Sequence, residues 1–350
     1  MLSALLTGTL LAGQGMVRAN AHNFVTIPRA SFRREGHPRI PELVAEVVAP
    51  RPFTEVIASW EATTPGGSWM EVTVQPDSTE GQAFVMAHWD ESGERRSSIK
   101  DQKFEAGRVD TDTLVLAQAT TRLIVRVKMQ PGPADAVGDL KWLSLSLTRP
   151  EPGESPQRAS RKSVWGTAME PVRRAQNSYP GGNVLCSPTS VSMVLAYWAS
   201  VTKDATIDAD VPEVQAGVTD PAWGGTGNWS FNAAFATRRP NMRAYVTRLR
   251  DVRDLEEWIA AKVPVVTSIS YALLKGEEKK RANDGHLVVL VGFAENGDPI
   301  FNDPGRAVVR MQYKRADFIK AWKNSDNTVY LIYPEGHNVP VGGPWADRGR

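Results

Sequence analysis

The chain has very little cysteine, because Cys186 is the only one among its 350 residues. A disulfide within the chain is therefore excluded, and so is a zinc site built on several cysteines. The five histidines are scattered along the sequence rather than grouped. We therefore expect neither a metal site nor another cofactor.

The chain also lacks a strong excess of charge of either sign. Lys and Arg together number 41 and Asp and Glu together number 39, which gives a net charge of +2. So small an excess gives no electrostatic reason to expect binding to nucleic acid or to an anionic membrane. No apolar run approaches the roughly 20 residues that a membrane-spanning helix needs, so we do not expect an integral membrane protein.

The first residues have the pattern of a secretory signal peptide. Residues 2–12 are mostly apolar, and Ala19-Asn20-Ala21 matches the small-x-small pattern of a cleavage site. The basic residue that normally precedes the apolar run of such a signal is missing. We predict a signal peptide over residues 1–21 and a secreted or periplasmic protein.

The length of the chain favours two domains over one. Its first half contains short runs of alternating apolar and polar residues separated by Pro and Gly, which is typical of an all-β sandwich or jelly roll. Its second half mixes helical periodicity with apolar strands, which is typical of an α+β domain. The predicted divisions are a signal peptide (1–21), an arm or linker (22–40), a β-sandwich (41–150), a linker (151–163), an α+β domain (164–335) and a C-terminal tail (336–350).

Four tryptophans of the β-sandwich allow two interpretations. Aromatic residues are common in strands, so these side chains are expected to fill the core. Alternatively they form a platform on which a sugar stacks, which would give the domain a carbohydrate or another surface ligand. The four are Trp60, Trp69, Trp89 and Trp142.

Cys186 lies where a loop rich in Pro and Gly becomes an apolar-periodic segment. Pro188 fits the first turn of a helix, where a missing N–H costs nothing. The thiol would then stand at a helix N-terminus, where the free N–H groups and the helix dipole favour the thiolate. Cys186 is therefore a candidate nucleophile, and a buried, inert cysteine is the alternative.

Two further residues complete a candidate triad with Cys186. His286 precedes the apolar run 287–293, and Asp303 follows the next predicted strand. The turn between these strands folds both residues to one end of the sheet. Symmetric pairing leaves Asp303 a few residues from His286, so a bulge or a twist has to close the gap. In a Cys-His-Asp triad the cysteine attacks, the histidine carries the proton and the aspartate fixes the histidine tautomer.

Three parts of the chain resemble motifs of one family. The stretches are Tyr179-Pro180-Gly181-Gly182 with Cys186-Ser187-Pro188-Thr189-Ser190, then Gly285-His286-Leu287-Val288-Val289, then Asn302-Asp303-Pro304. They are similar to the nucleophile, histidine and aspartate motifs of the bacteriocin-processing-peptidase-like cysteine peptidases, family thirty-nine of the papain-fold clan. The resemblance covers residues 165–335 and implies a papain-like fold and attack on a peptide or other amide bond. It implies Cys186, His286 and Asp303 as the triad, and Gln176 with the Cys186 N–H as the oxyanion hole.

The chain departs from the family pattern at two positions. Ser187 follows the cysteine, where many relatives have glycine, and is expected to add bulk beside the oxyanion site. Gln176 lies ten residues before Cys186, a longer spacing than is usual, which the intervening Pro- and Gly-rich loop has to absorb. Transporter-linked relatives cleave after Gly-Gly, but this chain has no transporter part, so that specificity is not carried over.

The sequence therefore predicts an exported cysteine peptidase or amidase, which acts on a peptide or protein through an acyl-enzyme. Two alternatives stay open. A transglutaminase-like acyl transferase would result if an amine outcompetes water. A non-catalytic binding protein would result if the triad is vestigial and the β-sandwich carries the function.

Overall fold

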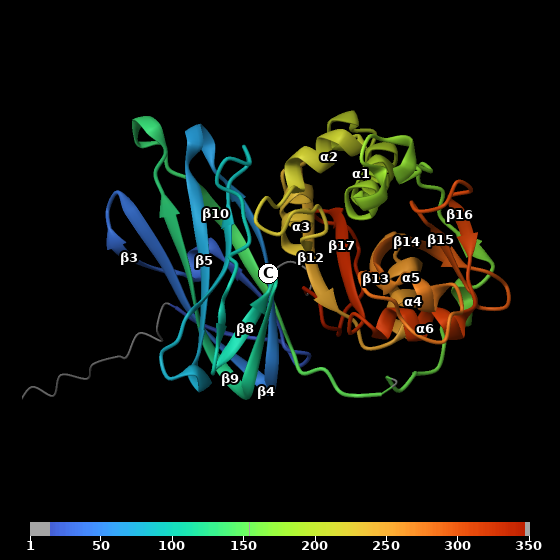
Figure 1. Cartoon of the computed structure of the whole chain (residues 1–350), viewed down its shortest axis with the longest axis horizontal. Coiled ribbons are helices and arrows are strands. Elements are labelled where there is room, and N and C mark those ends of the chain that lie inside the picture. The colour runs from blue at the N-terminus through green and yellow to red at the C-terminus, as the bar shows by residue number, and fades with distance from the viewer. Residues whose placement is uncertain (1–14, 154, 347–350) are drawn as a thin grey trace, which may run out of the picture.

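The structure, a computed structural model, describes residues 15–153 and 155–346. It has two halves that lie side by side in Figure 1, an N-terminal half of strands and a C-terminal half of helices around a second sheet. The apolar run predicted as the core of a signal peptide, residues 2–12, lies outside the described residues.

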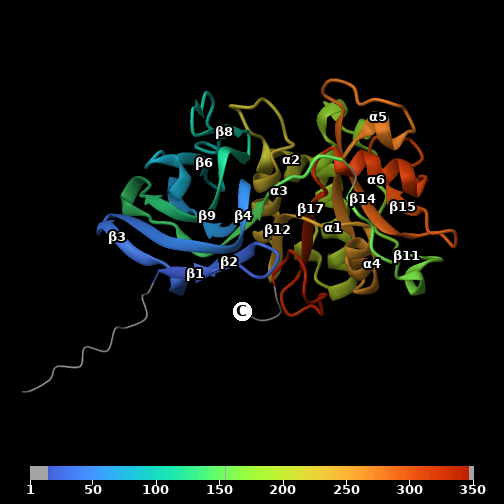
Figure 2. The same cartoon turned by 90° about the horizontal axis from the view of Figure 1, so that it is seen from below.

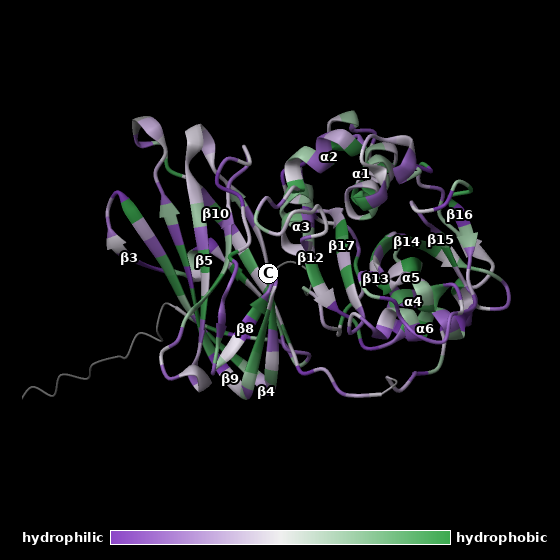
Figure 3. Ribbon diagram, in the orientation of Figure 1, coloured by the Kyte–Doolittle hydropathy of each residue, from purple (hydrophilic) through white to green (hydrophobic). Residues whose placement is uncertain are grey.

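The N-terminal half is built of strands. These are β1 (Met16–Arg18), β2 (Phe24–Pro28), β3 (Arg33–His37), β4 (Ile40–Thr63), β5 (Trp69–Pro76), β6 (Phe84–Trp89), β7 (Lys103–Phe104), β8 (Gly107–Asp110), β9 (Thr113–Gln130) and β10 (Asp139–Thr148). Six of them follow the order β2-β10-β4-β9-β5-β6, and the short strands β1, β3, β7 and β8 pair beside this path. Along β5 buried and half-buried residues alternate strictly, and Figure 3 shows the same alternation of hydrophobic and hydrophilic residues on the sheet.

Strands β4 and β9 are much longer than the short strands that the sequence predicted. Strand β4 runs through Pro50 and Pro52, although prolines were expected to separate strands. Its pairing with β9 changes register between Val48 and Glu55. A proline is tolerated at such an irregularity, because no ladder hydrogen bond is required from it. The described strands of the N-terminal half are thereby joined into one hydrogen-bonded sheet. The sandwich or jelly roll that the sequence predicted stays a prediction.

The N-terminal arm predicted over residues 22–40 is part of this sheet. Strand β2 pairs with β10 and buries Phe24, Val25 and Ile27, whose alternation is hidden by the basic residues that follow. Strand β1 pairs with β4 inside the predicted signal peptide, so cleavage after Ala21 would remove it from the sheet.

The predicted C-terminal tail also packs on the folded chain. Trp345 is 1% exposed and meets Trp258 edge to face, with ring centroids 5.5 Å apart. Its burial holds the end of the chain in place, because an aromatic ring of this size contributes a large apolar area.

The C-terminal half contains an antiparallel sheet with helices packed on it. Its elements are β11 (Thr167–Ala168), α1 (Cys186–Thr202), α2 (Val211–Val218), α3 (Trp229–Thr237), β12 (Met242–Arg248), α4 (Val252–Ala260), β13 (Val265–Ser270), α5 (Tyr271–Leu274), β14 (Gly285–Phe293), β15 (Pro299–Asn302), β16 (Arg310–Gln312), α6 (Arg315–Lys323) and β17 (Thr328–Pro334). The strand order is β12-β17-β13-β14-β15-β16, with β11 beside β14. Helix α1 contacts β14 at the centre of the sheet, so the end of α1 that bears Cys186 lies near the start of β14.

An aromatic cluster joins the two halves. Phe231 of α3 packs against Trp89 and Trp60 of the N-terminal sheet, with ring centroids 5.4 and 6.3 Å apart. Figures 1 and 2 both show α3 and β12 as the elements of the C-terminal half that lie nearest to β4. Trp60 and Trp89 are fully buried and Trp142 nearly so. Three of the four tryptophans considered as a sugar platform therefore belong to the core.

Hydrogen bonds continue the contact on both sides of this cluster. The Ser230 hydroxyl donates to the Ala58 carbonyl at 2.6 Å, and the Ser59 hydroxyl accepts the N–H of Val246 at 2.9 Å. In the connecting segment, Arg158 forms ion pairs with Asp251 at the start of α4. The segment predicted as a linker is thus fixed to the C-terminal half.

We expect Phe231→Ala to destabilise both halves together. Loss of a buried phenylalanine costs about 3–5 kcal/mol, and the cluster that it leaves open belongs to both sheets. Urea unfolding followed by tryptophan fluorescence and by far-UV circular dichroism should show one shared transition at a lower midpoint. Phe104→Ala is the matched control, because Phe104 is 44% exposed. Two separate transitions in the wild type would contradict this account.

Candidate active site

Cys186 is the first residue of α1, as the sequence predicted. The side chain is partly exposed, and the backbone N–H groups of Ser187 and Leu287 donate hydrogen bonds to its sulfur. The free N–H groups of the first helical turn add to the same positive field. The position thus favours a thiolate that a ligand can reach.

A bulge interrupts the hairpin of β14 and β15. Near the turn, Gly292 pairs with Ile300, but the next paired residues are Leu290 and Phe301. Val291 is therefore the extra residue of the longer strand. Such a bulge changes which side chains of the two strands share a face.

The bulge brings Asp303 to the same face of the sheet as His286. Regular pairing would set Asp303 opposite Val289, whose side chain points to the other face from His286. With the extra residue, Asn302 pairs with Val289. The next residue, Asp303, then comes opposite Val288, whose side chain lies on the same face as His286. The two residues then become diagonal neighbours, close enough for long side chains to meet.

His286 and Asp303 are hydrogen-bonded, and both are buried. The Nε2 atom of His286 lies 2.7 Å from Oδ1 of Asp303, which is fully buried. The same oxygen accepts the N–H of Gly305 at 2.9 Å, and the other oxygen accepts the hydroxyl of Tyr313 at 2.6 Å. Burial by itself would raise the pKa of Asp303, but the bonds from His286 and Tyr313 hold it below its usual value. The carboxylate therefore stays ionised.

The sulfur and the imidazole form a second hydrogen-bonded pair. Burial disfavours the charged imidazole, yet Asp303 and Cys186 raise the pKa of His286 to about 9. Burial also disfavours the thiolate, yet the hydrogen bond and charge of His286 hold the pKa of Cys186 below its ordinary value. Because Nε2 faces Asp303, Nδ1 is the atom left for the sulfur. The pair is best described as a thiolate and an imidazolium at neutral pH.

An aromatic ring covers the imidazole. Tyr271 lies over His286 with ring centroids 4.4 Å apart and an angle of 42° between the planes. This contact restricts rotation of the imidazole, so its two nitrogens stay directed at Cys186 and Asp303. No local pattern in the sequence marks Tyr271 or Tyr313, since their contacts with His286 and Asp303 depend on how the strands pair.

Cys186 opens into a cleft of 740 Å³ whose walls come from both halves. The C-terminal half contributes the glycine-rich loop at residues 223–227. The N-terminal half contributes the turn between β8 and β9 with Asp112. Asp112 accepts the N–H of Trp229 at 2.5 Å, and burial raises the pKa of this carboxyl to about 6. The turn thereby caps α3 and holds the two walls together.

Two models of known families match the chain. Residues 170–330 match the "Peptidase_C39 like family", and residues 37–141 match the "Peptidase C39 N-terminal domain". The chain carries a C39-like cysteine peptidase domain. The N-terminal half of this C39-like peptidase thus corresponds to a domain already associated with such enzymes.

Solved structures with partial similarity are distant. A C39-like peptidase from Bacillus anthracis is 16% identical, with 51% of this chain and 98% of that chain covered and a TM-score of 0.35. A Cry1Da tryptic core variant from Bacillus thuringiensis is 10% identical over 39% of this chain and 25% of that one, with a TM-score of 0.22. A family two carbohydrate esterase from Cellvibrio japonicus is 14% identical over 40% and 36%, with a TM-score of 0.17. No curated protein matches the chain significantly.

Gln176 lies next to the candidate triad. Its N–H donates to the carbonyl of Pro304 at 2.8 Å, and its side-chain Nε2 donates to the carbonyl of Gly182 at 2.7 Å. A Cβ at Gly182 would lie 2.3 Å from the Gln176 carbonyl oxygen, so only glycine permits the loop to fold back here. The loop absorbs the long spacing to Cys186. One hydrogen of the amide is then used. Gln176 is not among the residues that line the cleft, so its part in an oxyanion hole stays a prediction.

Ser187 does not crowd the oxyanion site, contrary to the expectation from sequence. It is fully buried, and its hydroxyl lies 3.0 Å from that of Tyr330 in the core. The side chains of consecutive helical residues point about 100° apart. Ser187 therefore faces the sheet while Cys186 faces the cleft.

In the part of the chain that the structure describes, there is neither a group of metal-binding side chains nor a helix that could span a membrane. No three His, Cys, Asp or Glu side chains there are grouped so that they could hold a metal ion. Within the same residues, no helix combines the length and apolar character needed to cross a membrane.

Gly305→Ala should disturb the candidate triad without replacing any of its residues. A Cβ at residue 305 would lie 3.1 Å from two atoms of the His286 ring and 3.3 Å from the Asp303 oxygen. We expect a drop of about tenfold in kcat and a smaller change in KM, because the displaced group acts on the proton rather than on binding. Unchanged kcat in a folded variant would show that the pair tolerates displacement.

Proposed function

We propose that the protein is an exported cysteine peptidase with a papain-like fold, which cleaves a peptide bond through an acyl-enzyme on Cys186. The observation that carries the proposal is the hydrogen-bonded series from Cys186 through His286 to the buried Asp303. A vestigial triad has no need of a fully buried carboxylate with three donors around it, since such an ion is costly to bury. The pattern at residues 1–21 supports export.

In the proposed reaction, the Cys186 thiolate attacks the carbonyl carbon of the scissile bond. The N–H of Cys186 and the free amide hydrogen of Gln176 would receive the developing oxyanion. The His286 imidazolium gives its proton to the leaving amine, and the C–N bond breaks to leave a thioester. His286 then removes a proton from water, which attacks the thioester and releases the acid.

The N-terminal half would position the substrate in this reaction. It provides one wall of the cleft, whereas most of its large aromatic residues are occupied in the core. We therefore propose a role in placing the peptide beside Cys186 rather than in stacking of a sugar.

A peptide library analysed by mass spectrometry tests the proposal. We expect new C-terminal carboxylates with the wild type and none with Cys186→Ala. Adding a primary amine distinguishes the alternative acyl transfer, because amide products would then replace acids. A wild type that forms neither product, although folded, would favour the binding protein with a vestigial triad.

A further inference from the structure

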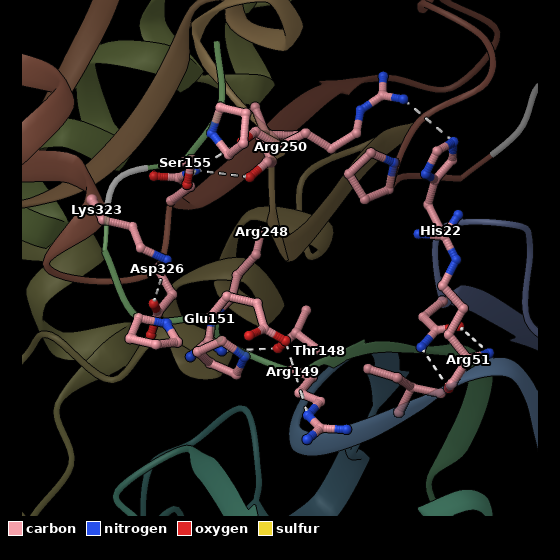
Figure 4. A pocket seen from close by; sticks show the side chains of 18 of the residues that line it. His22, Arg51, Thr148, Arg149, Glu151, Ser155, Arg248, Arg250, Lys323 and Asp326 are labelled. Carbon is pink, nitrogen blue, oxygen red and sulfur yellow. Dashed lines mark hydrogen bonds and ion pairs between the residues drawn. The ribbon is translucent and has the colours of Figure 1, made fainter. Parts of the chain in front are cut away.

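A second pocket lies where the two halves and the segment between them meet (Figure 4). Its volume is 510 Å³. In Figure 4, His22 and Arg51 of the N-terminal half face Lys323 and Asp326 of the C-terminal half across the opening. The pocket therefore exists only when both halves are in place.

This junction pocket adjoins the cleft that contains Cys186. Arg248 and Asp326 line both of them. An extended peptide advances by about 3.3 Å per residue. A substrate held at Cys186 that follows this shared wall would place a later residue in the junction pocket.

The junction pocket has more cations than carboxylates on its walls, and Arg51 is the cation without a partner. Among the described residues, no carboxylate forms an ion pair with its guanidinium. Every other Lys or Arg of the lining has one. The pairs are Arg248–Glu55, Arg250–Asp254 (2.6 Å), Lys323–Asp326 (3.3 Å) and Arg149–Glu151 (4.0 Å).

His22 lies beside Arg250 in the same pocket. Its Nε2 lies 3.4 Å from Nη1 of Arg250. Burial lowers the pKa of His22, Arg250 and Arg51 lower it further, and Asp254 and the backbone of Gly342 act in the opposite direction. A field that repels a proton from His22 attracts an anion.

The backbone of Arg51 is held in place. The side-chain amide of Asn23 donates to the Arg51 carbonyl at 2.9 Å, and its oxygen accepts the Arg51 N–H at 3.2 Å. A cation on a fixed backbone loses less freedom on binding than one on a mobile loop. A guanidinium also matches the two oxygens of a carboxylate.

We propose that the junction pocket binds a carboxylate of the peptide substrate through Arg51, so that the enzyme prefers peptides with Asp or Glu at a set distance from the scissile bond. This inference rests on the proposed function. It names the substrate class of that site as peptides with an acidic residue outside the immediate cleavage site.

A positional series of peptides tests the inference. It starts from a peptide that the wild type cleaves and moves a single Asp along each side of the scissile bond, with Asn in the matched control. We expect kcat/KM to rise about three- to tenfold for Asp over Asn at one or two positions, and to lose this gain in high salt. Arg51→Ala should remove the preference and leave cleavage of the Asn peptides unchanged. Arg51→Lys should keep part of it, and Arg122→Ala, an exposed arginine of the same sheet, should keep all of it.

The opposite results separate this inference from the proposed function. Cleavage with no preference at any position, or a preference that survives Arg51→Ala, overturns the inference alone. Inorganic phosphate that binds the wild type but not Arg51→Ala, without any advantage of Asp peptides, also overturns it, because the pocket would then hold a separate anion. A folded wild type that cleaves no peptide overturns the proposed function and this inference together.

Discussion

Cys186→Ala should abolish peptide cleavage, lowering kcat/KM by about 10⁴-fold or more, while the fold is kept. Loss of a nucleophile in a comparable triad removes nearly all of the rate enhancement, and what is left comes from binding and from the oxyanion hole. Cys186 is partly exposed, so the missing sulfur leaves no large closed cavity. The measurement is kcat/KM on a cleaved library peptide, together with the thermal midpoint Tm.

Cys186→Ser is the informative companion to this variant. It keeps the size of the side chain but replaces the thiolate by a hydroxyl that is a weak nucleophile at its ordinary pKa. We expect it to be folded and nearly inactive. Activity within tenfold of the wild type in either variant would rule out Cys186 as the nucleophile.

Asp303→Ala should lower kcat by about 10²–10⁴-fold, the second-largest effect that the geometry predicts. The carboxylate holds Nε2 of His286 at 2.7 Å and helps to raise the pKa of His286 to about 9. Without it, the imidazole loses its orientation and its pKa falls, so the thiolate loses its counter-ion. The measurement is kcat on the same peptide.

Tyr313→Phe provides the control for Asp303→Ala. It removes one hydrogen bond from the same carboxylate but leaves the carboxylate itself in place. We expect about a tenfold loss of kcat, which is the lower end of what one hydrogen bond to a charged group contributes. Equal losses of kcat in Asp303→Ala and Tyr313→Phe, together with a loss of far-UV circular dichroism signal, would mean that these hydrogen bonds only stabilise the fold.

The sequence predicted the members of the triad but not how they meet. The hairpin between β14 and β15 places His286 and Asp303 at one end of the sheet, but symmetric pairing brings them together only with a bulge or a twist. Nothing in the apolar run marks Val291 as the extra residue. Every side chain near it is apolar, so the register is decided by packing against the whole sheet rather than by local pattern.

The contact between the two halves could not be predicted from the sequence either. Trp60 and Trp89 have the alternation of ordinary core residues, and that interpretation is confirmed by their burial. Their partner Phe231 follows far along the chain, within α3. Sequence periodicity shows that a face is apolar, but it does not identify the element that covers the face.

The local conformation around Cys186 was more accessible to prediction. Pro188 and the apolar spacing placed the start of α1 correctly. The orientation of Ser187 depends on Tyr330, and the fold of the loop before Gly182 depends on one close approach to Gln176. Contacts of this kind come from tertiary packing, which a single sequence does not encode in any short pattern.

The rate of alkylation of Cys186 by iodoacetamide as a function of pH tests the central claim most directly. Because His286 holds the pKa of Cys186 below its ordinary value, the wild type should react rapidly at pH 6–7, where a free thiol of pKa about 8.5 is almost wholly protonated. Peptide cleavage should rise over the same acidic range, and it should fall above about pH 9, where His286 loses its proton. His286→Ala should react slowly at pH 6–7 and gain speed only toward pH 8.5. A wild-type profile that follows the ordinary thiol, or that is unchanged by His286→Ala, would contradict the ion pair on which the proposed mechanism depends.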